Sequence, residues 1–233
     1  MERNSFRKGL IDGLPICIGY LSVAFAFGIF SIDSGLTIAE ALLISMTNVT
    51  SAGQLAAVPI IVSGGTLIEL ATTQLIINLR YALMSVSLSQ RLGTSVRMID
   101  RFIISFVNTD EVFAVAMGQG MSVGRRYLYG LILTPYIGWS LGTLLGAAAG
   151  NILPAIVTSA LGIAIYGMFV AIVVPETKKS RPTLMCVLLA IALSCMFKYI
   201  PMLSAVPGGF VIIICAVIAS AVFAVIAPVS EQT

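Results

Sequence analysis

Long apolar runs separated by few charges constrain this chain more than any other feature of its sequence. Of its 233 residues, 58% are hydrophobic and only 10% are charged, and the mean hydropathy is +1.04. Soluble globular domains carry about 25% charged residues. A chain of this length cannot bury so much apolar surface in one water-soluble core. The sequence therefore predicts an all-α polytopic membrane protein that forms a single membrane-embedded domain over residues 1–233.

Eight apolar segments are candidates for membrane-spanning helices, each of which needs roughly 20 apolar residues. Six of them have the character of full spans, at residues 14–32, 66–88, 127–149, 152–174, 183–200 and 208–227. The other two, 36–62 and 103–119, have the polar centres "TNVTSAGQ" and "NTDE". We therefore expect a helical bundle with about six full spans, in which these two polar segments are broken or re-entrant.

The basic residues predict the orientation of the bundle, because cytoplasmic loops are rich in lysine and arginine. A cluster at the start of the chain places the N-terminus in the cytoplasm; it consists of Arg3, Arg7 and Lys8. A later loop would face outside if all eight segments crossed; its arginines are Arg91, Arg97 and Arg101. Re-entrant segments at 36–62 and 103–119 instead bring that loop into the cytoplasm, and this arrangement is favoured. Both arrangements leave the C-terminus in the cytoplasm.

Glycine recurs at every fourth position in "GWSLGTLLGAAAG". The positions are Gly138, Gly142, Gly146 and Gly150. Such a ridge has no side chains along one helix face, so another helix can approach closely within the membrane. The ridge is interpreted mainly as a helix-packing surface, and a docking or sliding surface is compatible with that.

The first polar cluster within an apolar segment is "TSAGQ", which contains Thr50, Ser51, Gly53 and Gln54. A helix broken at this point is tolerated only beside a cavity or inside protein. The free N–H groups at the start of the next half-helix would suit a carboxylate. A substrate site is therefore slightly favoured over the alternative, in which these side chains only form hydrogen bonds between helices.

The second cluster is Asn78, Arg80 and Tyr81 in "INLRYAL". Arg80 precedes Leu88 by eight residues, so it lies roughly 12 Å from that helix end. Its guanidinium either extends towards the interface, as long cationic side chains do, or binds a carboxylate as a planar fork. Asn78 and Arg80 are about 200° apart around a helix, so they do not face one cavity unless the helix is distorted.

The third cluster is the adjacent pair Asp110 and Glu111. Neighbouring residues of a helix point to different sides, so one carboxylate is expected to pair with Arg80 while the other titrates. Proton coupling requires a carboxyl group in a region of low dielectric constant. A purely structural salt bridge is an equal alternative. Glu69 lies near a span end and is interpreted as a surface charge.

Several classes of function find no support in the sequence. The chain has no histidine, its four cysteines lack a metal-ligand spacing, and no nucleophile or nucleotide-binding motif is present. The net charge of +3 is spread over loops. We therefore expect no enzyme activity, no metal site, no cofactor and no nucleic-acid partner.

The same residues resemble the AzlC family, the large subunit of bacterial branched-chain amino acid exporters. The likeness rests, in order, on "GLPICIGY", "AFAFGI", "SGLT", "TSAGQLAA", "INLRYALMSVSL" and "TDEVFAV". The chain departs from the pattern at Tyr81, where many relatives would have histidine, so any proton coupling would fall to Asp110 or Glu111.

The resemblance implies export of leucine, isoleucine or valine across the bacterial cytoplasmic membrane, together with a small hydrophobic partner of the AzlD type. Because no ATP-binding motif is present, transport is expected to be secondary, with a proton gradient as the expected driving force and the coupling ion left open. Two alternatives remain open, namely an exporter of another metabolite or cation and a membrane subunit that does not itself transport.

Overall fold

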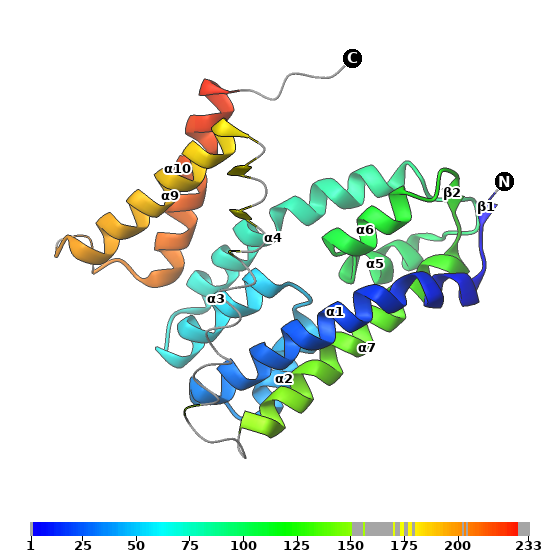
Figure 1. The fold of residues 1–233 in the computed structure, drawn as a ribbon, viewed down its shortest axis with the longest axis horizontal. Coiled ribbons are helices and arrows are strands. Elements are labelled where there is room, and N and C mark those ends of the chain that lie inside the picture. The colour runs from blue at the N-terminus through cyan, green and yellow to red at the C-terminus, as the bar shows by residue number, and fades with distance from the viewer. Residues whose placement is uncertain are drawn as a thin grey trace. The chain divides into compact units, whose positions relative to one another are not determined.

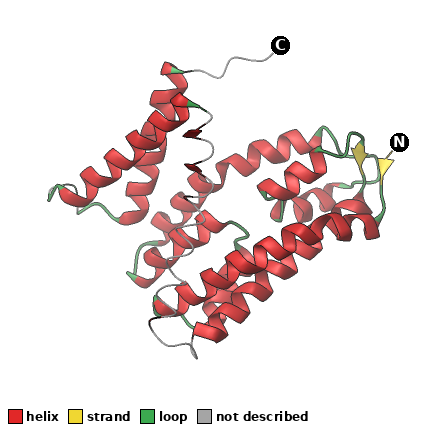
Figure 2. Cartoon of the chain, in the orientation of Figure 1, coloured by secondary structure: helices red, strands yellow, loops and turns green. Residues whose placement is uncertain are grey.

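The computed structural model describes residues 2–150, 156, 170, 173–174, 177–178, 180–201, 203 and 205–227. Helices dominate these residues (Figure 2), in agreement with the predicted all-α membrane class. The chain forms two compact units, of which the first comprises Met1–Leu55 and Asn78–Ile165 and the second Ala56–Ile77 and Tyr166–Thr233. Two helices contribute residues to both units, and the expected single domain stays a prediction.

Two long parallel helices, α1 (Phe6–Asp33) and α7 (Arg125–Gly150), form the centre of the first unit (Figure 1). Near the start of both helices, Gly130 lies against the backbone of Phe6 and Leu10. Near their ends, Gly28 lies against the backbone of Thr143 and Ala147. Both helices therefore begin at the same end of the unit.

The glycine repeat of α7 lies in this contact. A Cβ atom on Gly138 or Gly142 would be only 2.5 Å from the carbonyl oxygen of Cys17 or Leu21, respectively, and Gly146 faces the backbone of Phe25. A Cβ atom on Gly150 would lie 3.4 Å from its nearest neighbour, which is an ordinary van der Waals contact. The first three glycines therefore pack against α1, whereas the fourth position has room for a methyl group.

Three segments that carry basic residues meet at the end where α1 and α7 begin. The short strands β1 (Glu2–Arg3) and β2 (Ser122–Val123) pair in parallel (Figure 2), and Leu92 forms a bridge with Val123. The N–H of Gly124 donates to the carbonyl of Arg3 at 2.7 Å. Below we call this end, which contains Arg3, Arg97, Arg125 and Arg126, the basic end.

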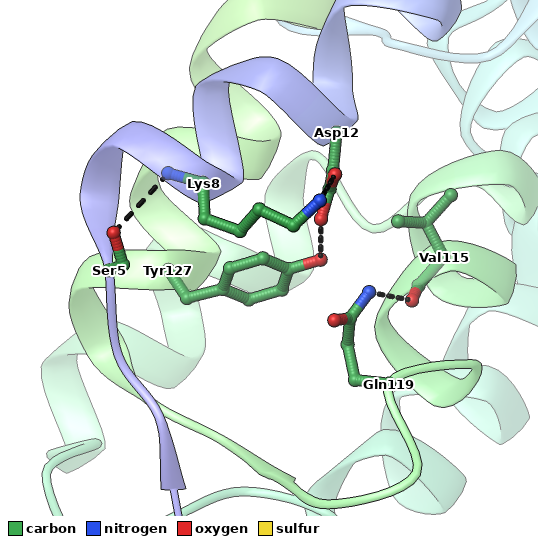
Figure 3. Close-up of polar contacts among 6 residues, drawn as sticks. All are labelled: Ser5, Lys8, Asp12, Val115, Gln119 and Tyr127. Carbon is green, nitrogen blue, oxygen red and sulfur yellow. Dashed lines mark hydrogen bonds and ion pairs between the residues drawn. The ribbon is translucent and has the colours of Figure 1, made fainter.

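A buried tyrosine joins the first turn of α7 to the second turn of α1 (Figure 3). The hydroxyl of Tyr127 donates to Asp12 at 3.0 Å, and Asp12 also pairs with Lys8 at 2.6 Å. Ser5 caps α1 by accepting from the N–H of Lys8. The start of α1 is thus fixed to α7 by polar contacts as well as by glycine packing.

The position of the loop after α4 (Leu67–Ser89) distinguishes the two topologies. Arg91 accepts a backbone hydrogen bond from Val123, so this loop lies at the same end as the start of α7. An arrangement in which all eight segments cross would put the two on opposite sides. Segment 103–119 thus returns to the end from which it starts, as the re-entrant arrangement predicts, whereas the same expectation for 36–62 stays a prediction.

The expected break in 103–119 is present between α5 (Met98–Phe106) and α6 (Asp110–Met117). These helices have nine and eight residues. At about 1.5 Å per residue each is too short to cross a hydrocarbon layer about 30 Å thick. The segment 36–62 is likewise divided into α2 (Ile38–Thr47) and α3 (Ser51–Val62).

A cysteine at Thr94 tests this topology, in a chain from which the native cysteines have been removed. Thr94 is exposed at the basic end, so Thr94→Cys is expected to react in intact cells only with membrane-permeant maleimides. The matched control is Asp33→Cys at the exposed far end of α1, which an impermeant maleimide should label. Labelling of Thr94→Cys by the impermeant reagent would restore the arrangement with eight crossings.

In the second unit, Glu69 is not the surface charge expected from the sequence. It is only 5% exposed, and its Oε1 accepts from the N–H of Gly209 at 2.9 Å, in the first turn of α10 (Gly208–Ile226). A Cβ atom on Gly209 would lie 2.7 Å from Cγ of Glu69. The interpretation was wrong because a glycine distant in sequence leaves room for the carboxylate at a helix N-terminus, where the free N–H groups favour it.

Four described helices are long and apolar enough to span a membrane, namely α1, α7, α9 (Arg181–Tyr199) and α10. The 23-residue helix α4 has sufficient length but is more polar. The expected span at 152–174 lies largely outside the described residues. The total of about six spans therefore stays a prediction.

Candidate functional site

Both helix breaks lie beside the middle of α7, at Tyr136. The hydroxyl of Tyr136 donates to the carbonyl of Met46, near the end of α2, at 3.1 Å. The ring of Phe106, the last residue of α5, is centred 6.4 Å from the ring of Tyr136. Helix α5 starts at the basic end, where Asp100 accepts from Tyr129 at 2.7 Å, whereas α2 follows the opposite end of α1. The half-helices α2 and α5 thus approach from opposite ends of α7, and both end beside Tyr136.

The local sequence explains why the helices stop and restart there. Helix α2 ends at Thr47, and Asn48 leaves the helical region with φ −135° and ψ 88°. Thr109 has the extended backbone typical of an N-cap, with φ −75° and ψ 170°. Asn, Ser, Thr and Asp favour such positions because their short polar side chains compete for backbone hydrogen bonds. The two acidic residues that follow Thr109 are favoured in a first helical turn by the helix dipole.

Tyr20 of α1 holds the second break in place. Its hydroxyl lies 2.6 Å from Oγ1 of Thr109 and also contacts the carboxylate of Glu111. The indole of Trp139 packs edge-on against the phenol ring, with a distance of 5.0 Å between ring centroids. A buried tyrosine therefore connects the start of α6 to both central helices.

The arginine in the apolar segment pairs with the first of the two carboxylates. Nη1 of Arg80 donates to Oδ2 of Asp110 at 2.5 Å, and Nη2 donates to the hydroxyl of Tyr81 at 3.1 Å. The guanidinium carbon also lies 4.8 Å from the centre of the Tyr81 ring. Arg80 thus reaches a carboxylate rather than the helix end, and Glu111 is directed to Tyr20, as expected for adjacent positions.

This ion pair is open rather than enclosed. The side chains of Arg80 and Asp110 are 52% and 46% exposed. A guanidinium has five N–H donors, and Arg80 directs only some of them to Asp110 and Tyr81. Charged groups within membrane segments face a cavity, a partner or a substrate, so the pair is suited to contact with another molecule.

Several buried polar atoms at the two breaks lack a hydrogen-bond partner within the described part of the chain. They are Oγ1 of Thr50, Oε1 of Gln54, Oδ1 of Asn108 and Nε1 of Trp139. Leaving such a group unsatisfied costs about 1–3 kcal/mol. The amide nitrogen of Asn108 donates to Ser85 at 3.2 Å, which connects the second break to α4. The breaks therefore retain polar atoms that can bind water or a polar ligand.

The structure brings some of the predicted site residues together and separates others. Arg80, Tyr81 and Asp110 meet directly, with Glu111 at the next position. The other polar break holds Thr50, Ser51, Gly53 and Gln54 at the start of α3. Asn78 lies about 200° around α4 from Arg80, because the helix continues without distortion.

Sequence reasoning missed three aromatic residues, namely Tyr20, Tyr136 and Trp139. Each has a polar atom on a large ring in an otherwise apolar run, and such residues usually need a partner when buried. That signal exists in the sequence, but it does not say where the partner lies.

Discontinuous helices, an intramembrane ion pair and buried polar groups at helix breaks define a multi-pass membrane protein of the transporter kind. The AzlC protein family matches residues 15–153, which contain both breaks and the Arg80–Asp110 pair, and the chain belongs to this family.

Relatives support the membrane assignment. An "uncharacterized membrane protein" of Archaeoglobus fulgidus is 34% identical over 175 residues, which cover 74% of this chain and 76% of that protein. The inner membrane protein YgaZ of Escherichia coli K12 is 29% identical over 185 residues, or 76% of this chain and 75% of YgaZ. An "uncharacterized membrane protein" of Helicobacter pylori is 24% identical over 156 residues, or 64% and 67% of the two chains. No solved structure matches the chain.

Proposed function

We propose that this chain exports leucine, isoleucine and valine across the bacterial cytoplasmic membrane, with both termini in the cytoplasm. It acts as the large subunit of a two-component exporter and is driven by the proton gradient. The observation that carries this proposal is the open Arg80–Asp110 pair beside a helix break halfway along α7. Transporters commonly place substrate sites at such breaks, near the membrane midplane.

The chemistry of an amino acid matches the groups at this depth. Its carboxylate is a partner for the remaining donors of Arg80 or for N–H groups at the start of α3. Its ammonium group is a partner for Asp110. A branched aliphatic side chain fits apolar surroundings and needs no further polar contact. Glu111, held by Tyr20, is then the carboxylate available to carry a proton.

A small partner subunit accounts for the exposure of the pair. The exposed half of an intramembrane ion pair needs water or protein beside it, because lipid does not solvate charge. An AzlD-type hydrophobic subunit packed beside α4 and α6 would enclose Arg80 and Asp110 and complete the pathway. The proposal thus gives the partner a physical role at this site.

The alternatives make different predictions. If the chain exports another metabolite or cation, unlabelled branched-chain amino acids will not inhibit the efflux of that substrate. A membrane subunit that does not transport would be insensitive to substitutions at the ion pair.

Efflux of labelled leucine from preloaded bacterial cells tests the proposal. We expect efflux to rise above background only when the chain is expressed together with its small partner, and collapse of the proton gradient should abolish the increase. Excess valine should compete, and a basic amino acid should not. Unchanged efflux, with both subunits verified in the membrane, would remove branched-chain amino acids as the substrate.

A further inference from the structure

We propose that the basic end of the first unit binds one anionic phospholipid, with its phosphate in a polar pocket and an acyl chain in an adjoining apolar groove. Neither cavity is lined by Arg80 or Asp110, although the groove reaches Phe106 and Tyr136 beside the helix breaks. Two neighbouring cavities of different character carry the inference, because they share two arginines.

The polar pocket is lined by arginines and short polar side chains and has a volume of about 380 Å³; its residues are Asn4, Thr94, Ser95, Arg97, Arg125 and Arg126. The loops around it are held in place by hydrogen bonds. Asn4 accepts from the N–H of Arg126 at 2.8 Å, and Ser95 accepts from the N–H of Arg125 at 3.0 Å. These bonds fix the backbone from which Arg125 and Arg126 extend.

Among the described side chains one carboxylate lies nearby, and it does not neutralise the pocket. Asp100 accepts from the hydroxyl of Tyr129 and from the N–H of Arg97, at 2.7 and 2.8 Å, and it lies 4.0 Å from Arg125. Burial opposes ionisation, but these hydrogen bonds and the nearby arginines lower the pKa of Asp100 below its ordinary value. The pocket thus has three arginines and, among the described side chains, one ionised carboxylate near them, which leaves a surplus of positive charge for an anion.

The adjoining groove has a volume of about 940 Å³ and is mainly apolar. Aromatic and aliphatic side chains of α5 and α7 form most of it, among them Phe102, Phe106, Leu133 and Tyr136. Arg125 and Arg126 line both cavities. An acyl chain in the groove would thus lead directly to a phosphate among the arginines.

Helix α5 is amphipathic, as expected for an element at a lipid interface. It buries Asp100 and Ile104 and exposes a continuous apolar row. That row consists of Met98, Ile99, Phe102, Ile103 and Phe106, of which Met98 is 71% exposed. The predicted orientation places this end in the cytoplasm, where anionic headgroups bind basic pockets between membrane helices.

The combination of the two cavities favours a phospholipid over two other occupants. A free phosphate would use the arginines but leave the groove unused. An apolar partner helix would fill the groove but would not require the guanidinium charges. Only an anionic amphiphile matches both cavities at once.

The test titrates the purified full-length chain in detergent with phosphatidylglycerol and, separately, with phosphatidylcholine of the same acyl chains, and counts bound lipids by native mass spectrometry. We expect one phosphatidylglycerol to bind at least about tenfold more tightly than phosphatidylcholine. The variants Arg125→Gln/Arg126→Gln and Phe102→Asn should each weaken this binding by a similar factor. Arg181→Gln, at the start of α9 in the second unit, is a control that removes a positive charge outside the site and should bind as the parent protein does.

Each other outcome overturns the site. Equal binding of the two lipids, or unchanged binding in the arginine variant, would leave no role for the basic pocket. Competition by inorganic phosphate, with no effect of Phe102→Asn, would identify a free-anion site. Displacement of phosphatidylglycerol by the purified small partner would show that the partner subunit, and not a lipid, occupies the groove. Each variant should retain the elution volume and Tm of the parent. If the double arginine variant does not fold, Arg97→Gln and Phe102→Asn decide the question.

Discussion

Arg80→Ala is expected to reduce amino acid efflux to background while the protein still inserts into the membrane. The substitution removes the cation that contacts Asp110 and, in the proposed mechanism, the substrate carboxylate. Hydrogen bonds to charged groups contribute about 1.5–3 kcal/mol each. The loss of one such contact from the transition state of transport would by itself lower the transport rate by about 10- to 100-fold. Efflux of labelled leucine, with surface-normalised expression, measures the effect.

Three further variants separate charge from position. Arg80→Lys keeps the charge but loses the planar fork and should recover only a fraction of the activity. The exchange Arg80→Asp/Asp110→Arg restores an ion pair in reversed order and should rescue stability more than transport. Arg181→Ala, which removes an arginine at the start of α9, should leave efflux unchanged. Parental efflux from Arg80→Ala would show that the pair is only structural.

Gly142→Ala should destabilise the first unit, although it adds a single methyl group. The new Cβ atom would lie 2.5 Å from the carbonyl oxygen of Leu21 and 2.9 Å from Cβ of Ala24. Since the nearest obstacle is backbone, the two helices must move apart, and overpacking of this kind typically costs about 1–3 kcal/mol. We expect a Tm lower by several degrees in detergent and less monodisperse protein on size exclusion.

Gly150→Ala provides the matched control, because it makes the same change two turns further along the same helix. Its Cβ would have ordinary contacts of 3.4 Å or more, and the helical backbone there accepts alanine at least as well as glycine. Its Tm should therefore equal or exceed that of the parent. If Gly142→Ala melted like Gly150→Ala, the close parallel packing of α1 and α7 would be wrong.

The sequence determined the class of protein and the positions where its helices break. Apolar runs with few charges require lipid as the solvent, and clusters such as "NVTSAGQ" and "NTDE" contain the residues that end and cap helices. These signals are local, since hydropathy and capping depend on neighbours along the chain. Such information survives in a single sequence, and the observed breaks at 48–50 and 107–109 agree with it.

Tertiary structure alone decided which groups meet. The sequence indicated that one of two adjacent carboxylates would pair with Arg80, but only the fold selects Asp110 and directs Glu111 to Tyr20. It also buried Glu69 against Gly209 and set the glycines of α7 against the backbone of α1. Each contact joins residues far apart in sequence, and its geometry depends on how helices pack in three dimensions. No local pattern contains that information, so residue types could be predicted but their partners could not.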